Sequence, residues 1–219
     1  MKIFIGYEEE YPEMFEVCKE SILRYNSNHE IIPLRKSKLE NDGVYWRAFQ
    51  GESTDFAFTR FLVPYLCNYE GNALFCDGDF LWYCDPEEIK DWVDDEAVSC
   101  VQHPWLVFEE HRKMKDKTNR PYKRKYWSSL MYFNNTKCKT LTKEAVSVRN
   151  AAWLHEMDWA ESVGSIPAIY NAMINYYDFS IKAKAVHFTD GGPWLDINDN
   201  LLYSTEWIKL YNNLLKTKI

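Results

Sequence analysis

The chain has 219 residues, of which 46% are hydrophobic and 27% charged, and this composition is typical of a folded protein rather than a disordered one. The formal net charge of −7 argues against a nucleic-acid partner, because a nucleic-acid surface needs concentrated basic side chains. No apolar run approaches the roughly 18–20 residues of a membrane span. Acidic residues follow the first short apolar run at once, so it is not a signal peptide, and we expect a cytoplasmic protein.

The first third of the chain predicts a strand, a helix and a second strand. Residues 2–6 form a β-rich run that ends in glycine, residues 11–25 carry apolar side chains at helical spacing, and residues 30–34 form another apolar run. This β–α–β order favours a parallel sheet. Residues 36–52 are polar and predict turns.

Alternating strands and helices continue to the C-terminus. The further predicted helices cover 55–69, 86–93, 142–154, 168–177 and 204–216, and the further strands cover 73–76, 97–102, 127–134 and 183–188. Pro64 marks either a kink or the start of its helix, and Thr142 is a plausible N-cap. The pattern indicates an α/β fold in one domain over 1–219.

The six cysteines form no Cys-x-x-Cys pair, so we expect no zinc site and reduced, buried thiols. The charged stretch 109–125 has two interpretations. It is either a solvated loop or a mobile segment that faces an acceptor.

The clearest chemical signal is Asp77-Gly78-Asp79, directly after an apolar strand. Ligands of open α/β sheets bind at this edge. Two carboxylates so close repel each other unless a cation lies between them, so the pair indicates a divalent-metal site. The alternative is a turn whose Asp side chains cap the next segment.

Two further polar residues lie in apolar surroundings. His187 leaves a buried strand just before Gly191 and Gly192, and could complete a metal shell or have a structural role. Arg60 interrupts an apolar helix face, and either extends to the surface or pairs with the Asp residues or a phosphate.

In chain order these features resemble the GT-A glycosyltransferases, close to glycosyltransferase family 8, from about residue 2 to residue 194. The resemblance rests on the N-terminal strand, the motif Thr-x-x-x-x-Arg-x-x-x-Pro, the Asp-x-Asp motif, a later Asn-rich strand, and the His before Gly-Pro-Trp. Segments 125–134, 166–171 and 187–194 are similar to small family-8-like enzymes of bacterial surface polysaccharides and of algal-virus capsid glycans.

The resemblance implies a GT-A fold, which is Rossmann-like with a mixed, mostly parallel sheet flanked by helices. It also implies a UDP-sugar donor, a glycan or glycoprotein acceptor, and Mn²⁺ or Mg²⁺ held by Asp77, Asp79 and His187. The implied catalytic residues are Asp158, Asp77 and Arg60. The implied donor-binding residues are Gly6, Tyr7, Glu8, Arg60, Asp77, Gly78, Ser128, Ser129, Gly191, Gly192 and Trp194. It also implies a retaining reaction, in the cytoplasm of a host if a virus encodes the chain.

The chain departs from the family at Gly192, where a Lys usually contacts the diphosphate. Neutralisation of that group then falls to the metal, to backbone N–H groups and to Lys125 or Arg124. Candidate acceptor platforms are Tyr45, Trp46, Trp105 and the 109–125 stretch.

Three other functions remain open. A sugar-phosphate nucleotidyltransferase usually carries a Gly-rich basic signature near the N-terminus, where this chain is acidic. A phosphatase of the haloacid-dehalogenase type has a Thr where Leu81 stands. A catalytically inactive nucleotide-sugar or carbohydrate-binding domain is argued against by the intact Asp and His residues.

Overall fold

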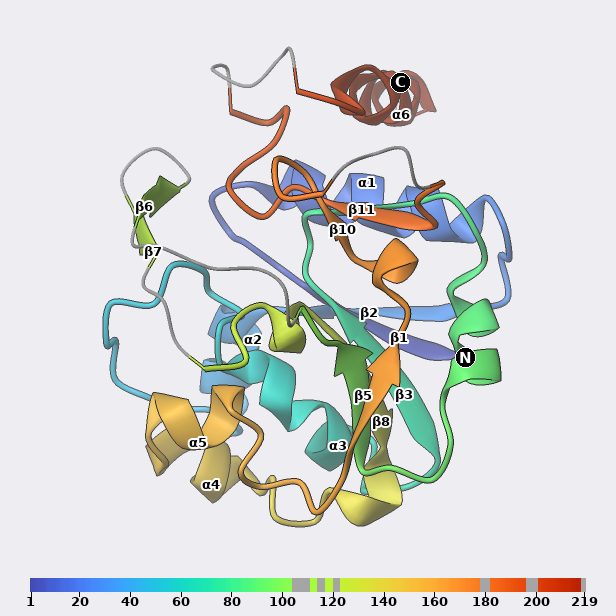
Figure 1. The fold of residues 1–219 in the computed structure, drawn as a ribbon. Helices are drawn as coiled ribbons and strands as arrows, with labels where there is room; N and C mark the ends of the chain where they lie inside the picture. Colours follow the sequence, from blue (N-terminus) through green and yellow to red (C-terminus); the bar gives the residue numbers. More distant parts are fainter. Residues whose placement is uncertain (104–110, 114–116, 120–122, 178–181, 196–200, 218–219) are drawn as a thin grey trace.

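The computed structural model describes residues 1–103, 111–113, 117–119, 123–177, 182–195 and 201–217, and for 111–113 and 117–119 it describes the backbone alone (Figure 1). A central sheet carries helices on both of its faces (Figure 1). Among the helices in these ranges, none combines the length and the hydropathy needed to cross a membrane.

The central sheet has six strands in the order β2-β1-β3-β8-β5-β9. These strands are β1 (Lys2–Gly6), β2 (Glu30–Leu34), β3 (Asn72–Cys76), β5 (Val98–Val101), β8 (Leu130–Asn134) and β9 (Val163–Ile166). β1 is parallel to β2 and β3, and β5 is parallel to β9, whereas β8 runs antiparallel to both β3 and β5. The expected mixed α/β sheet is confirmed.

A second, smaller sheet forms beside the C-terminal end of β3. It consists of β4 (Phe80–Trp82), β10 (Ala172–Met173) and β11 (Ala185–His187) in the order β10-β11-β4. β11 pairs with β4 in antiparallel register, so that His187 lies opposite Phe80. A separate two-stranded hairpin joins β6 (His111–Lys113) to β7 (Lys117–Asn119).

The helices are short apart from the first and the last. The α-helices are α1 (Pro12–Leu23), α2 (Lys36–Asn41), α3 (Val63–Leu66), α4 (Lys143–Val148), α5 (Ala151–His155) and α6 (Ser204–Thr217). The 3₁₀ helices are η1 (Thr59–Leu62), η2 (Pro86–Trp92), η3 (Trp127–Ser129), η4 (Asn135–Lys137) and η5 (Ala168–Tyr170). α1 lies on one side of the central sheet, α3, α4 and α5 lie on the other, and α6 lies beyond α1 (Figure 1).

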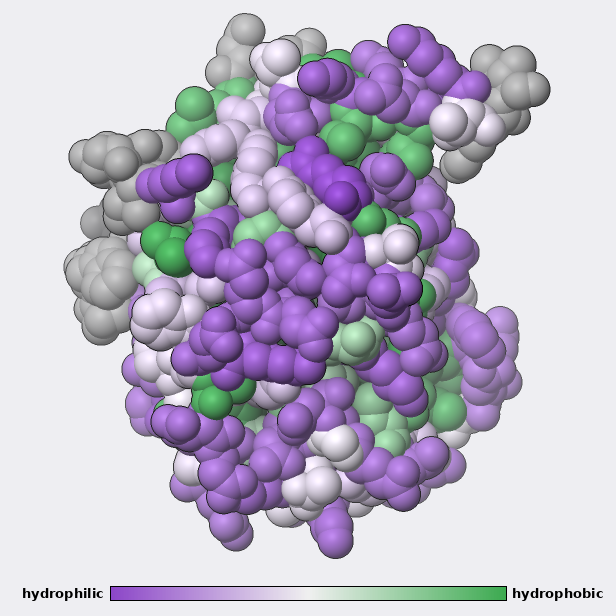
Figure 2. All heavy atoms as spheres, turned by 90° about the vertical axis from the view of Figure 1, so that its right-hand side faces the viewer, coloured by the Kyte–Doolittle hydropathy of each residue, from purple (hydrophilic) through white to green (hydrophobic). Residues whose placement is uncertain are grey.

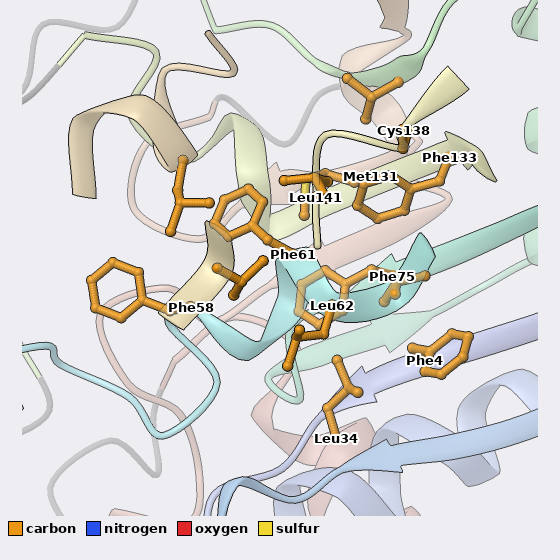
Figure 3. Close-up of a cluster of buried hydrophobic side chains, with 14 of the residues drawn as sticks. Phe4, Leu34, Phe58, Phe61, Leu62, Phe75, Met131, Phe133, Cys138 and Leu141 are labelled. Atoms are coloured by element: carbon orange, nitrogen blue, oxygen red, sulfur yellow. The ribbon is translucent and has the colours of Figure 1, made fainter. Parts of the chain in front are cut away.

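The core follows the two-residue alternation of strands. Phe4 and Phe75 point to the side of α3–α5, where they join Phe61 and Phe133 (Figure 3). Their neighbours along the same strands face the side of α1, in a second cluster formed by Ile3, Ile5, Leu74, Cys76, Cys18 and Ile22. A chain with two buried sheet faces needs apolar residues at successive strand positions, as β1 and β3 have.

Several predicted helices end earlier than expected. The 142–154 helix is two helices, because Arg149 is extended and Asn150 starts α5 by accepting a hydrogen bond from the Trp153 backbone N–H at 2.7 Å. Thr142 caps α4, as predicted. The 55–69 helix reduces to η1 and α3, since Pro64 can only occupy a first turn.

The prediction of a helix over 168–177 is wrong. η5 ends at Tyr170, Asn171 leaves the helical conformation with φ −147° and ψ 59°, and the chain then pairs with β11 as strand β10. Apolar spacing alone cannot separate a buried strand from a helix here, and the neighbouring strand decides the outcome.

All six cysteines are buried and free, as predicted. Hydrophilic residues cover most of the face shown in Figure 2, and hydrophobic ones are scattered among them.

Candidate functional site

The Asp77–Asp79 turn connects the central sheet to the smaller one. The Asp77 backbone N–H donates to the Ser129 carbonyl at 2.9 Å, which continues the β3–β8 pairing past the end of β3. A Cβ on Gly78 would lie 2.4 Å from the Gly6 carbonyl oxygen, so the turn sits directly against the end of β1. Glycine is therefore required for this close approach.

His187 reaches the turn because β11 pairs with β4. The Phe188 backbone N–H donates to the Asp79 carbonyl at 3.1 Å, next to the pairing of His187 with Phe80. The Nε2 atom of His187 lies 3.2 Å from Oδ1 of Asp79 and 4.0 Å from Oδ2 of Asp77. The strand register thus brings His187 beside two carboxylates that lie far earlier in the sequence.

Arg60 is buried and pairs with Asp77, with 2.8 Å between NH1 and Oδ1. Its guanidinium also donates to the carbonyls of Phe56 at 3.1 Å and Ser128 at 2.9 Å. Of the two interpretations of Arg60, the geometry supports the buried partner of an Asp.

A cavity of about 780 Å³ opens beside these side chains. Its wall includes Glu8 in the turn after β1, residues 49–55, 57 and 58, the two carboxylates of the Asp77–Asp79 turn, and residues of η3 and α5. The predicted site residues that line it are Glu8, Arg60, Asp77, Asp79, Ser128, Ser129 and His187. A cavity of this size is in the range of small-molecule sites.

The other predicted donor-binding residues do not line this cavity. Tyr7 is buried, and the guanidinium of Arg35 covers its ring at 3.7 Å from the ring centroid. Trp194 packs instead against Phe188 and Trp207, at ring distances of 6.0 and 5.8 Å. Gly6, Gly78, Gly191 and Gly192 are also absent from the lining, and Gly6 and Gly192 lie against aromatic rings.

Asp158 is exposed and lies outside the cavity lining. Its backbone N–H donates to the Trp153 carbonyl at 3.2 Å, at the turn that ends α5. Glu156, two residues earlier, does line the cavity. The role of Asp158 near the reacting atoms stays a prediction without geometric support.

Sequence reasoning missed His155, which lines the cavity beside Ser128. The Oγ atom of Ser128 lies 3.1 Å from Nδ1 of His155. Burial, together with the positive charges of Arg60, Arg47 and Lys125, lowers the pKa of His155 to about 3. His155 is therefore a neutral hydrogen-bonding group at physiological pH.

Asn171 is a second site residue that the sequence does not indicate, because the pattern predicts a helix over the residues that contain it. Its side chain is fully buried, and its Oδ1 lies 2.9 Å from Nδ1 of His187. His103 lies near it, with Nε2 at 3.4 Å from Asn171 Nδ2. Burial and then the charge of His187 lower the pKa of His103 to about 3.

The candidate acceptor platforms differ in position. Tyr45 belongs to the core, and Trp46 is 48% exposed but lies outside the cavity lining, whereas Phe49 lines the cavity and is 72% exposed. Trp105 and much of the 109–125 stretch lie outside the described residues. Lys125 is buried, and Arg124 donates to the Glu156 carbonyl.

The triad of Asp77, Asp79 and His187 fits a divalent cation. One ligand atom from each residue lies within 4.8 Å of the other two, and all three residues are buried. Carboxylate oxygens with one imidazole nitrogen are donors that Mn²⁺ and Mg²⁺ accept. Two buried carboxylates this close are stabilised by an intervening cation.

Comparison with solved structures defines the class of fold. The bifunctional glycosyltransferase WbbM superposes with a TM-score of 0.65 at 15% identity, over 97% of this chain and 50% of that one. The galactosyltransferase LgtC, solved with donor and acceptor sugar analogs, superposes with a TM-score of 0.62 at 9% identity, over 97% of this chain and 96% of that one. The chain spans about half the length of WbbM. The fold is that of the GT-A glycosyltransferases.

The sequence identifies the family more narrowly. No protein-family model matches the chain. Protein CDI of Arabidopsis thaliana is 39% identical over 219 residues, an alignment that covers 94% of this chain and 84% of that protein. The chain belongs to the same family as Protein CDI.

Proposed function

We propose that the chain is a metal-dependent glycosyltransferase, resembling family 8, that moves a sugar from a UDP-sugar to a glycan acceptor. The observation that carries the proposal is the buried Asp77–Asp79–His187 triad on the wall of a large cavity, in a GT-A fold. Other glycosyltransferases share this fold, and the triad supplies the ligands that a diphosphate-bridging cation needs.

Transfer breaks the bond between the sugar and the diphosphate, so negative charge develops on the departing UDP. A bound Mn²⁺ or Mg²⁺ would offset that charge as a Lewis acid. Protein groups hold the Asp77 side chain in place before any ligand binds. NH1 of Arg60 pairs with the Asp77 carboxylate, and the Asp77 backbone N–H donates to the Ser129 carbonyl. A preorganised site of this kind needs little rearrangement during the reaction.

We assign different roles to two parts of the cavity wall. Glu8, in the turn after β1, offers a carboxylate to the nucleoside. Ser128 and His155 offer neutral hydrogen-bonding groups to the sugar. We propose retention of the anomeric configuration by front-face attack of an acceptor hydroxyl within a short-lived ion pair, with no covalent nucleophile assigned.

Ligand-dependent thermal unfolding tests this function. We expect UDP with Mn²⁺ to stabilise the chain, and UDP alone, or GDP with Mn²⁺, to do so far less. Ligand at 100 times its Kd adds about 2.7 kcal/mol, which corresponds to a rise of a few degrees. A panel of UDP-sugars with Mn²⁺, assayed for UDP release, then identifies the donor.

Asp79→Asn is expected to abolish the Mn²⁺-dependent part of UDP binding. Asp85→Asn is the matched control, because Asp85 also pairs with a buried histidine, His29, at 2.6 Å, but outside the cavity lining. It should leave UDP binding unchanged. Equal UDP affinity in wild type and Asp79→Asn would overturn the metal site, and binding without any UDP release would favour the inactive binding domain.

A further inference from the structure

A chain of buried hydrogen bonds runs from η3 to His187. Asn171, between η5 and β10, contacts His187 through Oδ1 and contacts Oγ of Ser129 through Nδ2, each at 2.9 Å. Ser129 Oγ lies 2.6 Å from the Tyr126 carbonyl oxygen. Ser129, Asn171 and His187 are each 1% exposed or less.

The hydrogen bonds of this series can be assigned only one set of donors and acceptors. A carbonyl oxygen can only accept, so the Ser129 hydroxyl must donate its proton to Tyr126. The same hydroxyl is then left to accept from Asn171, which places the amide NH₂ toward Ser129 and Oδ1 toward His187. Because Oδ1 can only accept, Nδ1 of His187 must carry a proton.

A histidine binds a metal ion only through an unprotonated ring nitrogen, so a proton fixed on Nδ1 leaves Nε2 as the atom that can bind one. That atom faces Oδ1 of Asp79 at 3.2 Å and Oδ2 of Asp77 at 4.0 Å. We propose that Asn171 is a positioning residue that fixes His187 in the Nδ1–H tautomer and thereby turns Nε2 toward a divalent cation.

The inference rests on the proposed function, because it assumes that the triad binds a metal ion. It adds to that function a residue that touches neither metal nor substrate. Partners that orient a metal-binding histidine typically contribute about 10–100-fold to metal affinity. A purely structural Asn171 would instead change stability and leave the metal affinity of the folded protein unaltered.

The first test is the Mn²⁺ affinity of the full chain, measured by calorimetry with saturating UDP and again with Mn²⁺ alone. Asn171→Leu keeps the branched side-chain shape and removes the hydrogen bonds, and we expect about 10–100-fold weaker Mn²⁺ binding. Asn135→Leu is the matched control. Asn135 is equally buried and donates a side-chain hydrogen bond to the Glu70 carbonyl at 2.9 Å, so this variant should lose stability but keep its Mn²⁺ affinity.

The second test reads the tautomer directly in the metal-free protein, at a pH high enough to leave a single proton on the His187 ring. Long-range ¹H–¹⁵N spectra distinguish a protonated from an unprotonated ring nitrogen, and the signals of His187 are those missing from His187→Gln. We expect a protonated Nδ1 and a bare Nε2 in wild type, and loss of that pattern in Asn171→Leu. A wild-type His187 protonated at Nε2 alone would overturn the proposal, as would an Asn171→Leu variant with unchanged spectrum and Mn²⁺ affinity.

Asn171→Asp guards against a leucine variant that fails to fold. Its carboxylate still accepts from Nδ1–H, so the tautomer should survive although the donor to Ser129 is lost. Loss of the Nδ1–H pattern in folded Asn171→Asp would contradict the assigned direction of the bonds. If wild type binds no Mn²⁺ at all, the proposed function fails, and the nitrogen signals still decide whether Asn171 sets the tautomer.

Discussion

Arg60 and Asp77 form a buried ion pair that joins three separate segments of the chain. NH1 of Arg60 lies 2.8 Å from Oδ1 of Asp77, and the same side chain donates to the carbonyls of Phe56 and Ser128. η1, the turn after β3 and η3 are therefore held by one guanidinium. Loss of that cation would leave a buried carboxylate without its nearest positive charge.

We predict that Arg60→Met destabilises the chain by about 3–5 kcal/mol, the usual cost of breaking a buried ion pair. Urea unfolding measures this loss. A double variant with Asp77→Asn should be less destabilised than the two single changes added together, because it leaves no unpaired charge.

Lys38→Met is the control for Arg60→Met. Lys38 and Asp42 also pair closely, at 2.6 Å, but both side chains are largely exposed to solvent. Such surface pairs contribute about 1 kcal/mol or less. Equal losses in Arg60→Met and Lys38→Met would contradict a special role for the buried pair.

Gly78→Ala tests the contact between the end of β1 and the Asp77–Asp79 turn. The added Cβ would lie 2.4 Å from the Gly6 carbonyl oxygen, so one of the two segments must move. We expect a loss of about 1–3 kcal/mol from overpacking and at least 10-fold weaker Mn²⁺-dependent UDP binding. Both follow from one displacement of the Asp carboxylates.

Gly43→Ala separates the effect of crowding from that of losing a glycine. Gly43 has a φ of +65°, and a Cβ there would meet no atom within 4 Å. The variant should lose about 1 kcal/mol from left-handed strain and keep its UDP affinity. Wild-type UDP affinity in Gly78→Ala would show that the turn tolerates the displacement.

The candidate triad could be predicted because each member has a local signal in the sequence. Asp77 and Asp79 follow an apolar strand directly, and His187 ends another. The edge of an α/β sheet is where such strand ends converge, so a common site could be proposed, and the resemblance to the GT-A glycosyltransferases implied the three ligands together. The alternation of apolar runs and helical spacing indicated the α/β fold, whereas the antiparallel pairing of β8 could not be predicted from it.

The hydrogen-bond partners of the triad could not be predicted, because they depend on strand register and side-chain direction. Asn171 reaches His187 only because the expected helix is instead strand β10, paired with β11. His155 reaches Ser128 only because Asn150 starts a new helix. Tyr7 packs against Arg35 and Trp194 against Trp207, and neither lines the cavity. Contacts between such distant residues cannot be predicted from the local sequence pattern.

The stability of the chain should fall between pH 7 and pH 5, in part because of His155. Its pKa is lowered to about 3 in the folded protein, whereas the ordinary value in an unfolded chain is about 6.5. The unfolded state therefore binds a proton that the folded state excludes, and stability falls as the pH falls. We expect His155 to account for about 1–2 kcal/mol of the loss, which urea unfolding at both pH values measures.

His155→Phe removes the titrating group and keeps a ring between Phe58 and Phe61, which lie 5.4 and 5.2 Å from the imidazole. The variant should lose less stability than wild type over the same pH interval. If the free energy of unfolding depends on pH in the same way in both proteins, His155 takes up a proton in the folded state as readily as in the unfolded state.

The hydroxyl of Ser128 tests whether the η3 side of the cavity contacts the sugar. We predict that Ser128→Ala binds UDP with Mn²⁺ as wild type does but binds the donor UDP-sugar about 2–13-fold more weakly, the range expected for one hydrogen bond of 0.5–1.5 kcal/mol. Ser147→Ala is the control, since Ser147 is also buried and hydrogen-bonded, to the Trp46 backbone, but lies outside the cavity lining. Calorimetry with both ligands separates the outcomes. If UDP and the UDP-sugar both bind more weakly to the same degree, Ser128 contacts the nucleotide and not the sugar. If neither affinity falls, the Ser128 hydroxyl contacts no ligand and serves only to orient His155.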